Sequence, residues 1–474
     1  MVNEQSPRGS PRLEYKWRAL AAVAIGTFMS TLDSNIINVS LPTLGGVFSA
    51  DLTVVEWVVM AYQLTVTGLL LTFGRLADML GRKRIYNVGF VIFTLGSLMC
   101  ALSRSIGGLI GSRVLQGVGA AMLASNGTAI LTDAFPRSER GKALGLNGTI
   151  VGSGLMIGPP LGGLLIGALG WRSVFTINLP IGVVGMLLGY YLLRPDEPRP
   201  ERERFDAAGA LTLLVALTSI LLALSQGEAW GWSAPPTLGL LALSAAGFLA
   251  FVLTELRVKH PMMDLGLFRN RLFAASSLSA LISYMAIATA VFLMPFYLHD
   301  LRGFSPARTG LILAVSPLTM IVIAPFSGWL SDRIGSRVLS TLGISTIATA
   351  LVLLSRLTLT ASAGDIASRL FLVGAGNGLF TSPNSSAIMG AVPRQRLGLA
   401  AGMISTVRTT GMVTGVAIAG AVVAARRADF LAAGADPAHA FGGAIDAAFL
   451  VAAAIALAGA VPSLVRGREE RRAE

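Results

Sequence analysis

Residues 74–83 read GRLADMLGRK, and residues 328–337 repeat the pattern as GWLSDRIGSR. Each copy follows an apolar stretch and combines two glycines, one acid and a basic end. Because glycine permits sharp turns and close helix approach, both copies are expected to be tight loops between membrane-spanning helices. A set of glycines and a proline within residues 117–141 also recurs within residues 374–398. The chain is therefore predicted to contain two copies of one membrane-spanning unit.

The composition is that of a membrane protein. Of the 474 residues, 53% are hydrophobic and 13% are charged, and the mean hydropathy is +0.69. Counting apolar runs of about 18–28 residues predicts fourteen transmembrane helices, from residues 17–41 to residues 443–464. The first run is too long for the core of a cleaved signal peptide. A water-soluble fold and a disulfide scaffold are excluded, and Cys100 is the only cysteine.

The net charge of +12 is explained by topology. Most of the 37 Lys and Arg residues fall in loops on the same side as the N-terminus, which the positive-inside rule places in the cytoplasm. We expect a multi-pass protein of the cell (inner) membrane, embedded in the lipid bilayer, with both termini cytoplasmic. No basic groove with interleaved aromatic residues predicts a nucleic-acid partner. The three histidines are too far apart for a metal site, and no cofactor is expected.

The duplication divides the chain into three parts. Residues 1–193 are predicted to form an N-terminal six-helix bundle, and residues 271–474 a C-terminal six-helix bundle. Residues 194–270 are predicted to hold a cytoplasmic arm followed by a two-helix insert. The fold class is an all-α polytopic membrane protein. Two parallel copies with a binding site between them are an architecture of transporters.

Asp33 and Arg113 are ionisable residues inside predicted spans. A charged side chain within the membrane is costly and is usually functional. Asp33 lies eight residues before Leu41, and Arg113 eight residues after Ser105 on a helix that enters from the same face. Both are therefore about 12 Å deep and can meet. Asp33 is predicted to bind a coupling proton or cation, with Arg113 as its partner; the alternatives are a fixed ion pair that specifies packing, or direct contact with substrate. Gln116 and Asn147 are expected to support the pair or to form ordinary interhelical hydrogen bonds.

The local motifs carry a family resemblance. Residues 74–83 resemble the signature loop of the major facilitator superfamily, and four further segments resemble its fourteen-helix drug:proton antiporter branch. These segments run from Leu32 to Pro42, from Arg113 to Gly119, from Gly154 to Gly163 and from Trp171 to Gly182. The resemblance covers roughly residues 17–465. It implies the major facilitator fold, with two six-helix bundles plus two additional helices, and alternating access driven by protons.

Two mechanical elements are expected. A conformational latch is predicted from residues of the signature loop and a nearby acid: Gly74, Asp78, Gly81, Arg82, Lys83 and Asp133. The alternatives are a positive-inside anchor for the cations and a solvated helix end for Asp133. A seal and hinge between the bundles is predicted from the small residues and the proline of the fifth span: Gly154, Gly158, Pro159, Gly162 and Gly163. The alternative there is a generic packing helix.

A greasy, weakly polar substrate cavity is predicted from aromatic and polar residues of several spans. The candidates are Asn38, Trp57, Tyr62, Gln63, Gln116, Tyr284, Phe292, Tyr297, Asn377 and Arg408. Such surfaces bind many amphiphiles, although aromatic residues in spans more often serve as anchors or in packing. Arg408 is expected midway along a span at 398–425, facing a cavity or another helix. Glu56 is expected at the membrane interface, near a span end.

The resulting hypothesis is a monomeric proton-coupled antiporter that exports small hydrophobic or amphipathic compounds, as in multidrug efflux and antibiotic resistance. A dedicated exporter of a lipid, a siderophore or a natural product is the alternative within the same class. A membrane-embedded enzyme or a channel is the alternative from another class. An enzyme would need a cluster of acids, histidines or a nucleophile at one depth, and only Asp33 with Arg113 approaches that.

Overall fold

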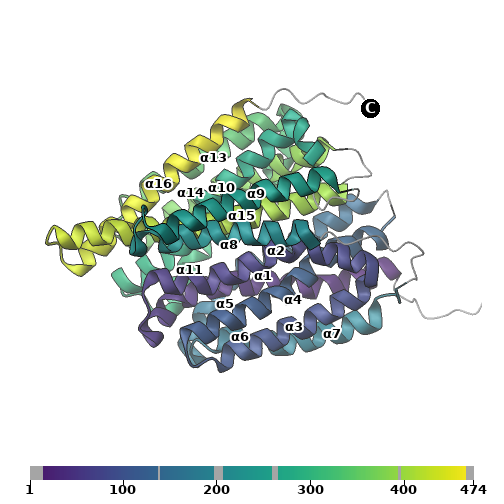
Figure 1. Cartoon of the computed structure of the whole chain (residues 1–474), viewed down its shortest axis with the longest axis horizontal. Helices are drawn as coiled ribbons and strands as arrows, with labels where there is room; N and C mark the ends of the chain where they lie inside the picture. Colours follow the sequence, from purple (N-terminus) through teal and green to yellow (C-terminus); the bar gives the residue numbers. More distant parts are fainter. Residues whose placement is uncertain (1–13, 137–138, 197–206, 259–264, 393–396, 466–474) are drawn as a thin grey trace, which may run out of the picture.

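The protein is all-helical in the computed structural model, which describes residues 14–136, 139–196, 207–258, 265–392 and 397–465. The first half occupies the lower part of Figure 1, coloured purple to blue. Its helices are α1 (Tyr15–Phe48), α2 (Leu52–Leu80), α3 (Arg82–Leu102), α4 (Ile106–Ala134), α5 (Arg140–Leu169), the short α6 (Ser173–Thr176) and α7 (Asn178–Leu192). They pack mainly against one another, and α4 lies against both α2 and α3.

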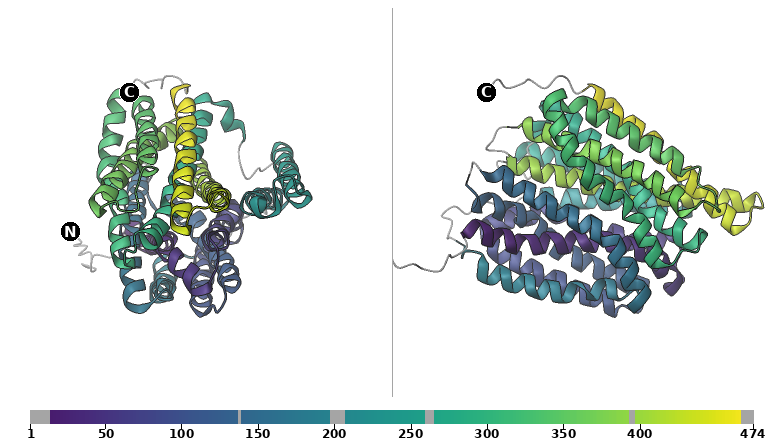
Figure 2. Two further views of the ribbon diagram at one scale, coloured as in Figure 1. Left: turned by 90° about the vertical axis from the view of Figure 1, so that its left-hand side faces the viewer. Right: turned by 180° about the vertical axis from the view of Figure 1, so that it is seen from behind.

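The second half repeats this arrangement. Its helices are α10 (Arg271–Phe296), α11 (Pro306–Leu313), α12 (Val315–Ile334), α13 (Ser336–Leu354), α14 (Ala363–Gly390), α15 (Leu397–Ala432) and α16 (Pro437–Val465). Between the halves run α8 (Ala207–Trp230) and α9 (Pro235–Arg257). Helix α8 packs on α2 of the first half and on α15 of the second. Helix α9 packs on α8 and lies at the edge of the molecule (Figure 2).

The number of membrane spans agrees in part with the predicted fourteen. Twelve helical stretches of the described residues are long and apolar enough to cross a membrane, and Ala208–Leu224 of α8 is a shorter apolar helix. The protein is therefore a multi-pass membrane protein. Helix α14 is not among the twelve, because polar residues such as Asn377 and Asn384 interrupt its apolar sequence. It is nevertheless 28 residues long and packs between α12 and α13.

The two halves meet most closely at one end. Helix α1 begins and α16 ends at the same end of the molecule, which we call the termini end, and the opposite end is the far end (Figures 1 and 2). Helix α5 packs extensively on α11 near the far end but only slightly on α12. A Cβ atom placed on Gly163 would lie 2.2 Å from the carbonyl oxygen of Pro306, and one on Gly310 would lie 2.1 Å from that of Pro159. The halves are therefore in backbone contact at the far end.

Candidate functional site

A buried polar network surrounds Asp33 in the first half. Arg113 Nη1 donates a hydrogen bond to Asp33 Oδ2 at 2.7 Å, and Gln116 Nε2 and Asn178 Nδ2 donate to Oδ1 at 2.8 and 2.7 Å. Asp33 is 1% exposed, and the three donor residues are 0% exposed. Hydrogen bonds to a charged acceptor are the strong ones, so these donors complement a carboxylate. Asp33 and Arg113 are in contact, as their equal predicted depths allow.

Arg113 connects α4 to two other helices. Its Nη1 also donates to Gln116 Oε1 at 2.6 Å, and its Nε donates to the carbonyl oxygen of Val58 in α2 at 2.9 Å. The guanidinium lies 4.1 Å from the centre of the Tyr62 ring, a cation–π contact. Within the part of the chain that the structure describes, Arg113 Nη2 and Asn178 Oδ1 have no hydrogen-bond partner. The network therefore holds unused donor and acceptor capacity for water or for a rearranged side chain.

Glycines bring α4 close enough to its neighbours for this network to form. A Cβ atom placed on Gly96 of α3 would lie 2.6 Å from the backbone of Gln116. One on Gly117 would lie 2.9 Å from the carbonyl oxygen of Tyr62 in α2, and one on Gly119 would lie 2.3 Å from the backbone nitrogen of Phe93 in α3. Small residues at such crossings let helix backbones approach. The glycines that follow Arg113 in the fourth-helix motif thus set the position of the arginine.

Two members of the network were not predicted from the sequence. Asn178 begins α7 and holds Asp33, and Ser97 of α3 accepts a hydrogen bond from Gln116 Nε2 at 2.8 Å. Asn178 lies in the segment from Trp171 to Gly182 that resembles the antiporter branch, so the sequence motif could have identified it as a candidate. Ser97 lies in none of the segments that carry the family resemblance. Asn147, which was expected to support the pair or to form an ordinary hydrogen bond, accepts one from Thr27 at 3.1 Å.

The predicted latch residues lie at the termini end of the first half. Arg82 Nη1 lies 3.9 Å from Asp133 Oδ2 and donates to the carbonyl oxygen of Ala129 at 3.3 Å, so the predicted pair is close. Lys83 Nζ donates to the carbonyl oxygens of Tyr190 and Leu193 at 2.6 and 2.8 Å, at the end of α7. Cations at helix C-termini are favourable. The backbone of Gly74 lies in α2, and the side chain of Asp78 lies outside the described residues.

An unpredicted acid sits over the latch. Asp196 accepts hydrogen bonds from the backbone nitrogens of Lys83 and Arg84 at 2.9 and 3.0 Å, and so occupies the N-terminus of α3. Gly81 has φ +104°, and a Cβ atom there would lie 2.2 Å from Asp196 Oδ2. The positive φ favours a glycine at position 81, and the absence of a side chain there leaves room for the Asp196 carboxylate.

The small residues of α5 lie on two faces. Cβ atoms placed on Gly154 and Gly158 would lie 2.9 Å from side chains of Thr31 and Asn35 in α1, and Gly162 packs on α1 in the same way. Pro159 and Gly163 instead contact α11 of the second half. One face of α5 thus packs on α1 of the first half, and another face packs on α11 of the second half at the far end.

Most of the predicted cavity residues are packed against neighbouring helices in the described part of the chain. Seven are buried in helix packing: Asn38, Tyr62, Gln63, Gln116, Tyr284, Phe292 and Tyr297. Trp57 and Asn377 are half-buried. Tyr297 donates to the carbonyl oxygen of Thr358 at 2.7 Å, which fixes it in the second half.

Arg408 is exposed, and within the described residues it has no ion pair or hydrogen bond. Its position differs from the expected middle of a span, because α15 is 36 residues long and continues to Ala432. Arg408 therefore lies nearer the termini end of the helix, where a long side chain can reach the membrane surface.

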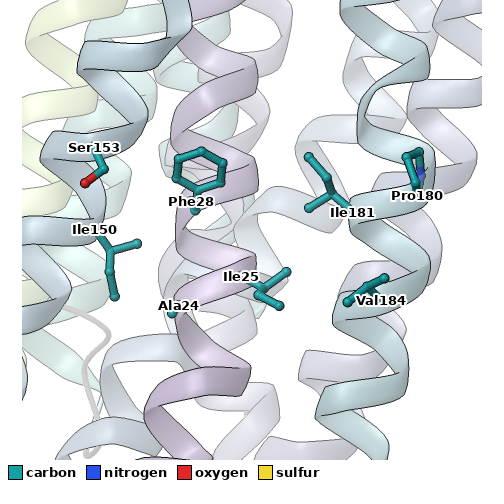
Figure 3. A pocket seen from close by; sticks show the side chains of 8 residues that line it. All are labelled: Ala24, Ile25, Phe28, Ile150, Ser153, Pro180, Ile181 and Val184. Carbon is teal, nitrogen blue, oxygen red and sulfur yellow. The ribbon is translucent and has the colours of Figure 1, made fainter.

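An open apolar groove of about 530 Å³ lies elsewhere, between α1, α5 and α7. Figure 3 shows Ala24, Ile25 and Phe28 of α1 between Ile150 and Ser153 of α5 on one side and Pro180, Ile181 and Val184 of α7 on the other. None of the ten predicted cavity residues lines it.

Comparison with known sequences agrees with these features. The family model described as Major Facilitator Superfamily matches residues 23–416 and, separately, residues 276–474. The chain is 37% identical over 405 residues to riboflavin transporter RibZ of Clostridioides difficile, covering 85% of this chain and 88% of that protein. It is 36% identical over 408 residues to multidrug resistance protein Stp of Mycobacterium tuberculosis, covering 86% and 75%.

The fold also matches a solved structure. A crystal structure of a bacterial homologue of the human lysosomal transporter Spinster, in an inward-facing and unoccupied conformation, superimposes with a TM-score of 0.70 at 16% identity. The match covers 98% of this chain and 100% of that one. With two similar halves, repeated signature loops and a family match over most of its length, this chain belongs to the major facilitator superfamily and is a transporter rather than an enzyme.

Proposed function

We propose that this transporter is a proton-coupled antiporter that exports hydrophobic or amphipathic compounds from the cytoplasm by alternating access. The observation that carries the proposal is the buried Asp33–Arg113 pair, with its donors from α4 and α7. A carboxylate so deep among membrane-spanning helices is costly and is usually functional. The names of the two relatives, a riboflavin transporter and a multidrug resistance protein, support a small organic substrate.

Asp33 would carry the coupling proton. In this conformation neither water nor substrate reaches it, because it is 1% exposed, so proton exchange requires the network to open. A proton on the carboxylate would remove the charge that Arg113 neutralises and weaken all three hydrogen bonds. Arg113 would then be free to move with α4. Inward movement of each proton charge would supply about 2.3 kcal/mol per 100 mV of membrane potential.

The topology follows from this proposal. We place the termini end in the cytoplasm, in accord with the loop charges, so that closure at the far end makes this an inward-facing state. Helices α8 and α14 complete fourteen crossings, and a monomer with bundles 1–193 and 271–474 is the transport unit. The Arg82–Asp133 contact and the loop around Gly81 act as the latch at the cytoplasmic end. Pro159 and Gly163 of α5 act as the seal and hinge against α11.

A dedicated carrier is the second candidate function. It is favoured by the 37% identity to a riboflavin transporter, which is as high as the identity to a multidrug resistance protein. In that case one planar, partly polar compound would be moved, rather than many amphiphiles. A lipid, a siderophore or another natural product would be alternative cargoes of the same kind of carrier.

The test uses the purified protein in lipid vesicles with an imposed pH gradient. Three probes are compared, namely a lipophilic cationic dye, a neutral amphiphile and riboflavin. The proposal expects uphill accumulation of both amphiphiles, which a protonophore abolishes. Accumulation of riboflavin alone would identify a dedicated carrier. If all three probes move at rates that do not change with the proton gradient, proton coupling is contradicted. Empty vesicles give the background.

A further inference from the structure

The apolar groove between α1, α5 and α7 opens on the outer surface of the first half. Helices α5 and α7 each pack on α1 but not extensively on each other, so α1 forms the floor of the groove and the other two form its walls (Figure 3). All eight lining residues belong to the first half. Beside the groove, Val183 and Leu187 of α7 are 47% and 46% exposed. Since all three helices are candidate membrane spans, the groove faces the acyl chains of the bilayer.

The lining of the groove is almost wholly apolar. Ser153 is the one lining residue with a polar side chain, and its hydroxyl donates a hydrogen bond to the carbonyl oxygen of Thr149 in the same helix at 2.9 Å. A polar group placed in the groove would lose hydrogen bonds to water without replacing them, which is costly. The groove therefore suits a hydrocarbon chain better than a polar molecule.

The groove leads toward a cation at the termini end. Arg18 and Ile25 are seven residues apart in α1 and so lie on the same face, which continues to Phe28. From Arg18 to Phe28 is ten residues, or about 15 Å along the helix axis. The hydrocarbon core of a bilayer is about 30 Å thick, so this face spans about half of it. It matches the reach of one acyl chain from the leaflet at the termini end.

Two arginines lie at this end of the groove, where α1 begins and α7 ends. Arg18 Nη2 donates a hydrogen bond to the carbonyl oxygen of Tyr191 at 3.1 Å. The Arg194 guanidinium lies 4.0 Å from the centre of the Tyr15 ring. Tyr191 is itself seven residues beyond Val184, which lines the groove. Both walls of the seam between α1 and α7 thus end at a positive charge.

Both arginines keep their charge available for an anion. Lys16 pairs with Glu14 and with Glu139 at 3.0 Å, whereas Arg18 and Arg194 have no acidic partner among the residues that the structure describes. Arg18 uses one of its five N–H donors in the contact with α7. A guanidinium group binds a phosphate group well, frequently through two parallel hydrogen bonds. The phosphate group of a phospholipid lies at the membrane surface, at the depth of these side chains.

We propose that this groove is a binding site for an anionic phospholipid of the leaflet at the termini end. One acyl chain lies over α1 between α5 and α7, and the phosphate group lies against Arg18 and Arg194. The ligand is a lipid rather than cargo, because the groove pairs an apolar channel with a cationic end and none of the predicted cavity residues lines it. The site goes beyond the proposed antiport and does not depend on it.

The test uses the full chain in phosphatidylcholine vesicles that contain a small share of a phospholipid with a diazirine in one acyl chain. The head group of this probe is phosphatidylglycerol in one set and phosphatidylcholine in the other, with identical chains. After illumination, mass spectrometry locates the labelled peptides. The phosphatidylglycerol probe should label residues 24–28 and 180–184 several-fold more than the phosphatidylcholine probe. Equal labelling would indicate lipid contact without recognition of the head group and would overturn the inference.

The cationic end is tested by Arg18→Gln combined with Arg194→Gln. This variant should lower labelling by the phosphatidylglycerol probe to the level of the phosphatidylcholine probe. Arg257→Gln combined with Arg269→Gln is the matched control, because it removes the same charge from exposed positions at the end of α9 and just before α10, also at the termini end. The control should label like the unchanged protein. An equal loss in both variants would assign the preference to general attraction by positive charge and would overturn the inference.

The apolar channel is tested by Val184→Phe, which fills the groove from the α7 wall. Val183→Phe is the matched control, because Val183 is as exposed as Val184, at 47% and 48%, but does not line the groove. Val184→Phe should reduce labelling of residues 24–28 several-fold, and Val183→Phe should not. Equal labelling in the two variants would contradict a chain in the groove. If Val184→Phe does not insert, Ser153→Leu fills the groove from the α5 wall, and the same outcomes apply.

Occupation of the groove by cargo is tested by competition. The lipophilic cationic dye, the neutral amphiphile and riboflavin are each added in excess before illumination, with no pH gradient. Labelling by the phosphatidylglycerol probe should be unchanged. Its loss with any of the three compounds would assign the groove to cargo and overturn the inference. Because the assay measures neither transport nor proton coupling, its outcome is separate from that of the vesicle test of antiport.

Discussion

Helices α4 and α14 occupy matching places in the two halves, and they are packed by the same device. Helix α4 lies against α2 and α3, and α14 lies against α12 and α13. Gly119 of α4 recurs in the repeat as Gly376 of α14. A Cβ atom on Gly119 would lie 2.3 Å from a backbone atom of α3, and one on Gly376 would lie 2.8 Å from a backbone atom of α13. Close backbone packing is thus common to both halves.

The buried polar residues of α4 have no counterparts at the matching positions of α14. Where α4 has Arg113 and Gln116, the repeat gives α14 Leu370 and Val373, which are each 3% exposed. At these two positions the second half therefore packs the helix with apolar side chains. The comparison teaches that the glycines serve the fold, whereas the buried arginine and its network are not needed for packing at this place. Their retention in the first half favours a functional role for Asp33.

The largest effect is expected when the first half is made to resemble the second. Arg113→Leu alone leaves the Asp33 charge buried without its partner and should lower the free energy of unfolding by about 3–5 kcal/mol. Asp33→Ala combined with Arg113→Leu should recover most of that loss, because an apolar replacement of a buried pair is often neutral. Thermal unfolding in detergent measures both. A double variant as unstable as the single one would show that the pair is structural.

Asn178→Ala tests the network one hydrogen bond at a time. Loss of a hydrogen bond to a charged group should cost about 1.5–3 kcal/mol of stability. Ser97→Ala is the matched control, because Ser97 contacts Gln116 and not Asp33, and it should cost about 0.5–1.5 kcal/mol. The two are compared by thermal unfolding and by proton-driven transport. Equal effects on transport would argue against a direct role for Asn178 at Asp33.

The shared glycines should respond alike in the two halves. Gly119→Ala and Gly376→Ala each force a methyl group against a neighbouring helix, and overpacking of this kind costs about 1–3 kcal/mol. The loss should be larger for Gly119, where the approach is closer. Unfolding temperatures of the two variants check the order. A large loss of stability in Gly119→Ala with none in Gly376→Ala would show that the two glycines do not have the same packing role.

The smallest effect is expected at the latch. Arg82 and Asp133 are 3.9 Å apart, and the Asp133 side chain is 79% exposed, so the pair should contribute about 0–1 kcal/mol to stability. A double-mutant cycle with Arg82→Gln and Asp133→Asn measures this coupling energy. If the pair instead selects one arrangement of the halves, the transport rate will change in either single variant while the unfolding temperature does not. A coupling energy well above this range would place the pair among the structural contacts.

Part of this structure could be predicted from the sequence. Helix rise alone placed Asp33 and Arg113 at one depth, and the glycine spacing indicated where helices approach closely. The partners that were missed, Asn178 and Asp196, depend on which helices are neighbours and on how each is rotated about its axis. Arg408 was placed at mid-span because the predicted span ended at residue 425, whereas α15 continues to Ala432. Glu56 was assigned by depth alone, which cannot reveal that its buried side chain lies against Gly420 of α15.

The most direct test of proton coupling is transport by Asp33→Asn in vesicles with an imposed pH gradient. Asparagine keeps the size of the side chain and its hydrogen-bonding capacity but removes the proton site. Because it also leaves the buried Arg113 charge without its partner, thermal unfolding is measured alongside transport to establish that the variant is folded. The proposal predicts that uphill accumulation of the amphiphilic probes falls to the level of empty vesicles. Accumulation equal to that of the unchanged protein, still abolished by a protonophore, would contradict a coupling role for Asp33.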